Sequence, residues 1–132
     1  MSSIVFYAST AGNAEAAAGY IASKIGGKAV PIASASSEDI SQADTVVFGS
    51  RVHAGGVHRD IRNYIESNRD ALASKRTAYF LTCLFRDERG DRQCADIGKA
   101  LGIETGAYFV GAKKAVASGD TSELDAFVSK LV

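Results

Sequence analysis

Several features that mark particular protein classes are rare or missing in this chain of 132 residues. Lysine plus arginine and aspartate plus glutamate number 15 each, so net charge gives no reason to expect binding to nucleic acid or to an anionic membrane. The only cysteines, Cys83 and Cys94, lack CxxC spacing and the company of zinc ligands. We therefore expect reduced thiols with buried structural roles, as is typical of a cytoplasmic protein.

Long apolar runs are also missing. None approaches the length of a membrane span, and the amino terminus has only a short run at residues 4–8 with no basic region before it. We expect no signal peptide and no membrane span. Hydrophobic residues make up 46% and charged residues 23%, close to ordinary globular usage. The length suits one domain over residues 1–132 with its own core.

Five segments have the character of β-strands. Apolar runs at residues 4–8, 45–49 and 77–82 do not alternate with polar residues, which is typical of strands buried on both faces. Residues 28–32 and 108–112 complete the set. The single proline, Pro31, cannot donate a ladder hydrogen bond, so the second strand should lie at an edge of the sheet.

Helical periodicity appears between these strands. Gly102 should end the third periodic segment, and the pair Asp120 and Glu123 resembles a capping box before the last one. Residues 36–41 could form a further short helix. The apolar positions at helical spacing are Ala17, Ile21 and Ile25; Val57, Ile61, Ile65 and Leu72; Cys94, Ile97 and Leu101; and Leu124, Phe127, Val128 and Leu131.

Strands that alternate with helices predict the α/β class, with right-handed crossovers and a sheet covered on both faces. Since the second strand lies at an edge, we expect a doubly wound, five-stranded parallel sheet in the order 2-1-3-4-5. The switch point then falls between strands one and three. Ligand chemistry is expected in the loops that follow Ala8 and Gly49.

The loop at residues 9–14, with the sequence STAGNA, has the chemistry of an anion site. Gly12 can adopt a positive φ angle, hydroxyls and the Asn13 amide supply donors, and a helix begins there. The loop has no lysine or arginine and no Gly-Lys-Ser/Thr ending, which argues against a nucleoside triphosphatase. A GxGxxG dinucleotide fingerprint is also missing. A tight turn capped by Thr10 or Asn13 is the alternative.

STAGNA after a first strand resembles the phosphate loop of flavodoxins, a motif of the type (S/T)xTGN(T/A). The resemblance extends over nearly the whole chain and implies an FMN cofactor. It also implies that hydroxyls and amides hold the FMN phosphate without a basic residue in the loop. Ala11 stands where many members carry a hydroxyl.

The loop after the third strand, GSRVHAGGVH, resembles a flavodoxin subgroup that includes menaquinone-dependent protoporphyrinogen dehydrogenase. In flavodoxins this loop lies against the flavin ring. Here it offers no tryptophan or tyrosine, so His53 or Arg51 would have to serve. His53 and His58 have no acidic or cysteine ligands nearby in the sequence, so no metal is expected. His58, near a helix start, is expected to form local hydrogen bonds.

The loop after the fourth strand covers the other face and the edge of the ring in flavodoxins. It continues into a charged stretch at residues 86–92, which could equally be a solvated loop. The cofactor contacts that the resemblance implies are Ser9, Thr10, Ala11, Gly12, Asn13 and Ala14; Ser50, Arg51, Val52, His53, Ala54, Gly55 and Gly56; and Thr82, Cys83, Leu84 and Phe85.

The resemblance favours an FMN-binding electron carrier that shuttles low-potential electrons between redox partner proteins in the cytoplasm, as a monomer or weak homodimer. We expect no residue with a catalytic role of its own. An FMN-dependent oxidoreductase of the protoporphyrinogen dehydrogenase or quinone reductase type is one alternative. A flavin-free interaction module is the other. A receiver-like module is disfavoured because residues 7–10 supply no acidic cluster at the end of the first strand.

Overall fold

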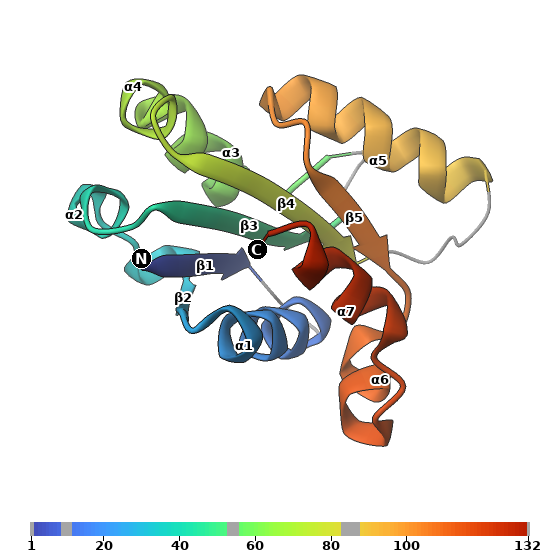
Figure 1. The fold of residues 1–132 in the computed structure, drawn as a ribbon. Coiled ribbons are helices and arrows are strands. Elements are labelled where there is room, and N and C mark those ends of the chain that lie inside the picture. Colours follow the sequence, from blue (N-terminus) through green and yellow to red (C-terminus); the bar gives the residue numbers. More distant parts are fainter. Residues whose placement is uncertain (1, 9–11, 53–55, 83–87, 132) are drawn as a thin grey trace.

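A five-stranded parallel sheet forms the centre of the molecule (Figure 1). The computed structural model describes residues 2–8, 12–52, 56–82 and 88–131. The strands are β1 (Ser3–Ala8), β2 (Lys28–Pro31), β3 (Thr45–Arg51), β4 (Arg76–Thr82) and β5 (Gly106–Phe109), and their order is β2-β1-β3-β4-β5. All four pairings are parallel. The predicted fold class and strand order are confirmed, and Pro31 lies on an edge strand.

One helical layer covers each face of the sheet, as Figure 1 shows. On one side lie α1 (Asn13–Ile25), α6 (Ala112–Ser118) and α7 (Ser122–Ser129). The other side holds α3 (Arg59–Ser67), α4 (Arg69–Leu72) and α5 (Glu88–Leu101). The 3₁₀ turn η1 (Ile32–Ser34) and the short helix α2 (Ser37–Ser41) follow β2, and Ile32 and Ile40 join the core of this second side.

Alternating residues of each strand fill two separate cores. Val5, Val47 and Phe80 point into the core beneath α1 and α7, where the Phe80 ring packs 5.8 Å from that of Phe109. Phe6 and Phe48 point into the opposite core. Strands buried on both faces have no solvated side, which is why their apolar runs do not alternate.

Gly49 on β3 is required by close packing. A Cβ atom built on it would lie 2.0 Å from Cζ of Phe80, a distance that ordinary side-chain contacts do not reach. The missing side chain therefore lets the Phe80 ring lie across the middle of the sheet, just before the strands reach their carboxyl ends.

Some predicted boundaries are wrong. The fifth strand begins two residues earlier than expected and ends at Phe109, because Gly111, with φ of 67°, turns the chain into α6. The predicted helix with Val57 and Leu72 is two helices that break at Asn68. Before α7 the cap position is Thr121 rather than Asp120, so the expected capping box does not form. A capping box does occur between Ser36 and Asp39.

The described residues contain no helix that combines the length and the apolar character needed to cross a membrane.

Candidate functional site

The candidate site lies at the carboxyl edge of the sheet, where β1, β3 and β4 end at Ala8, Arg51 and Thr82. The register pairs Ala8 with Ser50 and Arg51 with Thr82, so these ends are level with one another. In a doubly wound sheet, ligands bind outside the carboxyl ends at the switch point, which here lies between β1 and β3. The three loops predicted to contact a cofactor all leave from this edge.

Helix α1 begins at this edge and directs its amino terminus there. Its cap residue is Gly12, whose φ of 85° is a left-handed conformation that glycine adopts without strain. The first helical hydrogen bond runs from N of Ala16 to the Gly12 carbonyl over 3.0 Å. The N–H groups of Asn13, Ala14 and Glu15 therefore precede the helical ladder and point toward an incoming acceptor. Together with the helix dipole they favour an anion.

Asn13 connects this amino terminus to α6. Its Oδ1 accepts a hydrogen bond of 2.9 Å from the backbone N–H of Lys113. With the carboxamide oxygen engaged in this way, the groups that Asn13 can offer to an anion are N–H donors. The same bond fixes Lys113 beside the start of α1, although the two residues lie far apart in the sequence.

The Ser50 side chain joins the two ends of the loop that follows β3. Ser50 is 1% exposed, and its hydroxyl donates to the Arg51 carbonyl and accepts from N of His58, each over 2.8 Å. Nδ1 of His58 accepts from N of Asp60 over 3.1 Å and caps α3, in agreement with the local role expected for this residue. Val52 donates its N–H to the Thr82 carbonyl over 3.0 Å, which joins this loop to the end of β4.

Thr82 places a buried hydroxyl at this edge. The residue is 4% exposed, and its Oγ1 has no hydrogen-bond partner among the described residues. It alternates with Phe80 along β4 and therefore lies on the α1 side of the sheet. Leaving a buried hydroxyl unsatisfied costs about 1–3 kcal/mol, so a ligand atom that accepts its proton would remove a real penalty.

Charge near the edge is mixed. Tyr7, on the α1 side of β1, is half-buried; burial first, and the nearby Glu15 carboxylate second, raise the pKa of its phenol. Tyr7 therefore stays neutral near pH 7. Two exposed cations lie near this edge: Arg51 at the end of β3 and Lys113 at the start of α6. Of the charged residues named here, two are cations and one, Glu15, is acidic, a balance that favours an anionic ligand.

The structure describes about half of the residues that were predicted to contact a cofactor. It describes Gly12, Asn13, Ala14, Ser50, Arg51, Val52, Gly56 and Thr82, which lie in or beside the loops that leave this edge. The others lie outside the described residues: Ser9, Thr10, Ala11, His53, Ala54, Gly55, Cys83, Leu84 and Phe85.

Lys113 was not among the predicted contacts, because the last strand was expected to end at Ala112 and no helix was predicted over residues 112–118. The usable signal was Gly111 followed by Ala-Lys-Lys-Ala, a stop residue before good helix formers.

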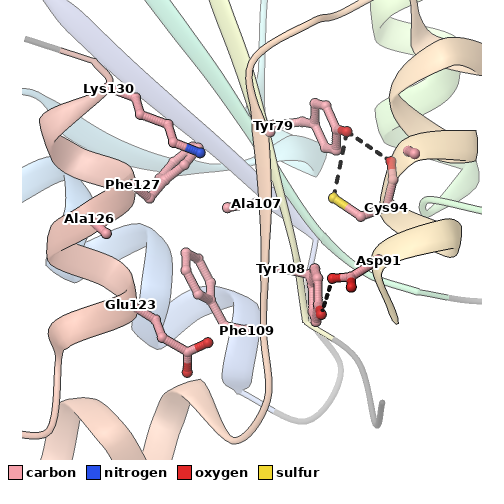
Figure 2. A pocket seen from close by; sticks show the side chains of 12 residues that line it. Tyr79, Asp91, Cys94, Ala107, Tyr108, Phe109, Glu123, Ala126, Phe127 and Lys130 are labelled. Atoms are coloured by element: carbon pink, nitrogen blue, oxygen red, sulfur yellow. Dashed lines mark hydrogen bonds between the residues drawn. The ribbon is translucent and has the colours of Figure 1, made fainter. Parts of the chain in front are cut away.

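A separate groove lies along the exposed edge of β5, between α5 and α7 (Figure 2). On its α5 side the Tyr79 hydroxyl donates to the Cys94 carbonyl over 2.8 Å and lies 3.6 Å from Sγ, and Tyr108 donates to Asp91 over 2.6 Å. Burial raises the pKa of Tyr79, so its hydroxyl stays protonated. Cys94 is half-buried against Tyr79. These polar groups satisfy one another, which indicates a structural contact rather than a cofactor site.

A doubly wound, five-stranded parallel sheet in the order β2-β1-β3-β4-β5 defines a flavodoxin-like fold. The chain belongs to the flavodoxin family: the family model described as "Flavodoxin domain" matches residues 4–113. Flavin binding and electron transfer are the properties of this family. A comparison with curated proteins gives no match.

Solved structures with the same fold include complete flavodoxins. The two-electron reduced flavodoxin of Megasphaera elsdenii is 18% identical, with 98% of this chain and 99% of that chain covered and a TM-score of 0.68. A flavodoxin from Streptococcus pneumoniae TIGR4 is 15% identical, with 99% and 97% covered and a TM-score of 0.68. The rubredoxin oxygen:oxidoreductase of Desulfovibrio gigas is 16% identical with a TM-score of 0.67. Its match covers 99% of this chain but 37% of that protein.

Proposed function

We propose that this chain binds one FMN at the carboxyl edge of its sheet and carries low-potential electrons between redox partner proteins. The observation that carries the proposal is the pairing of two features at one edge. The amino terminus of α1 presents N–H groups at the switch point, and at the end of β4 the buried Thr82 hydroxyl has no partner within the described part of the chain. Both features suit a ligand with phosphate and hydroxyl oxygens, and the family supports a flavin.

In this proposal, different residues bind different parts of the cofactor. N–H groups of Asn13 and Ala14 bind the phosphate through charge-assisted hydrogen bonds, and the hydroxyls of Ser9 and Thr10 add to them. Thr82 donates to an oxygen further along the ligand. The loops at residues 50–56 and 82–85, whose first residues lie at the same edge, would contact the flavin ring. When bound, FMN supplies the one- and two-electron redox chemistry, while the protein sets its exposure and electrostatic surroundings.

A carrier is favoured because the flavodoxin family, whose model matches residues 4–113, transfers electrons through a bound flavin. The oxygen reductase among the similar structures is much longer than this chain, so its activity is not carried over. We place the carrier in the cytoplasm, as a monomer or weak homodimer. Saturable oxidation of protoporphyrinogen with menaquinone would instead support an oxidoreductase.

The cofactor assignment is tested by titrating the apoprotein with FMN and with riboflavin while flavin fluorescence is followed. We expect FMN to bind more tightly than riboflavin, because only FMN carries the phosphate. Thr10→Asp should weaken FMN binding by at least about 2 kcal/mol, roughly 30-fold, through lost donation and like-charge repulsion. Unchanged FMN affinity in this variant, or riboflavin binding as tightly as FMN, contradicts the phosphate-loop assignment.

A further inference from the structure

Lys113 brings a cation to the start of α1 from a distant part of the chain. A Cβ atom built on Gly12 would lie 3.4 Å from Cδ and 3.5 Å from Nζ of Lys113, so the end of this side chain lies beside Gly12. The bond from N of Lys113 to Oδ1 of Asn13 fixes its main chain. The packing of α6 against α1 holds both helices in this arrangement.

The position is electrostatically unfavourable for an ammonium group in the absence of a ligand. The amino terminus of a helix carries a partial positive charge, which repels cations. Glu15, in the first turn of α1, is the acidic group on that helix nearest its start. Among the described residues Lys113 forms no ion pair with it or with any other carboxylate. An anion bound at this amino terminus would turn the repulsion into attraction for both the helix and the lysine.

We propose that Lys113 recognises the phosphate of the cofactor, so that the site combines the α1 amino terminus with a cation supplied by α6. The inference rests on the proposed FMN binding and deepens it. The loop at residues 9–14 contains no basic residue, so local donors alone were expected to hold the phosphate. With Lys113 the site instead uses charge as well, and it should distinguish phosphorylated from unphosphorylated flavin more strongly than neutral donors do.

The test compares three variants of the full chain by flavin titration. Lys113→Gln removes the charge, Lys113→Arg keeps it, and Lys114→Gln removes the neighbouring exposed charge on the same helix as a matched control. We expect Lys113→Gln to weaken FMN binding about tenfold, the scale of one partly solvated charge-assisted contact, and to leave riboflavin binding unchanged. Lys113→Arg should retain most of the FMN affinity. Lys114→Gln should alter the preference for FMN by less than about twofold.

A second readout does not depend on flavin. Inorganic phosphate added to the apoprotein should shift the amide NMR resonances of Gly12 and Asn13, at lower phosphate concentration in the wild type than in Lys113→Gln. The dependence of FMN affinity on salt should also be weaker in that variant, because one ion contact is lost. Circular dichroism of each variant checks that the fold is retained.

The outcomes separate the two proposals. If wild-type protein binds FMN tightly and Lys113→Gln keeps the full preference for FMN over riboflavin, the role of Lys113 is wrong and the proposed function stands. An equal loss in Lys114→Gln would likewise overturn a specific role, since general positive charge on α6 would explain the result. If the wild type binds neither flavin, the proposed function fails, and the inference drawn from it fails as well.

Discussion

Replacing Thr82 by valine should have opposite effects on the apoprotein and on the complex with FMN. The side chain is 4% exposed and its hydroxyl has no partner among the described residues. Valine has nearly the same shape, so the substitution exchanges an unsatisfied hydroxyl for a methyl group without leaving a cavity. If the hydroxyl serves the cofactor, the free protein bears a cost that the bound protein does not.

The expected magnitude follows from the burial. Removing an unsatisfied buried hydroxyl returns about 1–3 kcal/mol, and the buried methyl adds at most about 0.8 kcal/mol. We therefore expect apo Thr82→Val to be about 1–3 kcal/mol more stable than the wild type. Unfolding entropy for a chain of 132 residues is about 0.28 kcal/mol/K, so each 1 kcal/mol raises Tm by roughly 4 °C. Loss of one hydrogen bond should weaken FMN binding by about 1 kcal/mol, roughly fivefold.

The assay is urea unfolding of the apoprotein together with FMN titration of the folded protein. Thr77→Val is the matched control, because Thr77 lies on the same strand but near its opposite end, half-exposed, where water can satisfy its hydroxyl. It should change both quantities by less than about 0.5 kcal/mol. A less stable apo Thr82→Val would show that the hydroxyl already has a partner in solution. Greater stability with unchanged FMN affinity would show that the cofactor does not use it.

Three further predictions concern packing, pH and redox potential. Gly49→Ala should lower the free energy of unfolding by about 1–3 kcal/mol, because the added Cβ would collide with the Phe80 ring. Gly19→Ala, which has open space around it, should be neutral or stabilising, and equal urea midpoints for the two variants would contradict this packing. Burial, and secondarily the charge of Asp39, raises the pKa of Tyr64 to about 12. The stability that the protonated phenol contributes is therefore complete below pH 10 and is lost between pH 10 and about 12. In urea unfolding Tyr64→Phe should lose less stability than the wild type over this range, and an equal loss would refute the raised pKa. Arg51→Gln should lower the potential for the second electron of bound FMN by tens of millivolts at low salt. An unchanged or raised potential in a spectroelectrochemical titration would show that Arg51 does not face the reduced flavin.

The sheet was predictable from the sequence because both of its faces are buried. Continuous apolar runs in β1, β3 and β4 leave no solvated face, and this feature alone separates them from amphipathic strands. One proline then limited the strand order, since Pro31 could lie only at an edge. These signals act within a few residues of one another, so reading along the chain recovers them.

The ends of the elements were less predictable because several conformations compete there. Apolar character continues from Phe109 through Ala112, so the run resembled a single strand, although Gly111 adopts a left-handed conformation and divides it. Before α7, Asp120 and Thr121 are both good cap residues. Thr121 is the one selected, and its hydroxyl also donates to Asp125, which accepts a bond from Tyr20 of α1 as well. Contacts between distant helices decide such cases.

The candidate site shows the same limit more clearly. Its motif at residues 9–14 indicated where an anion could bind, because a glycine-led helix start follows from local sequence. The charge beside that start does not follow from local sequence. Lys113 reaches Gly12 only because β5 ends next to β4 and α6 then folds back against α1. A loop without lysine or arginine therefore says nothing about the charge an anion meets there, since a parallel sheet brings the loop of one strand beside the helix that follows another.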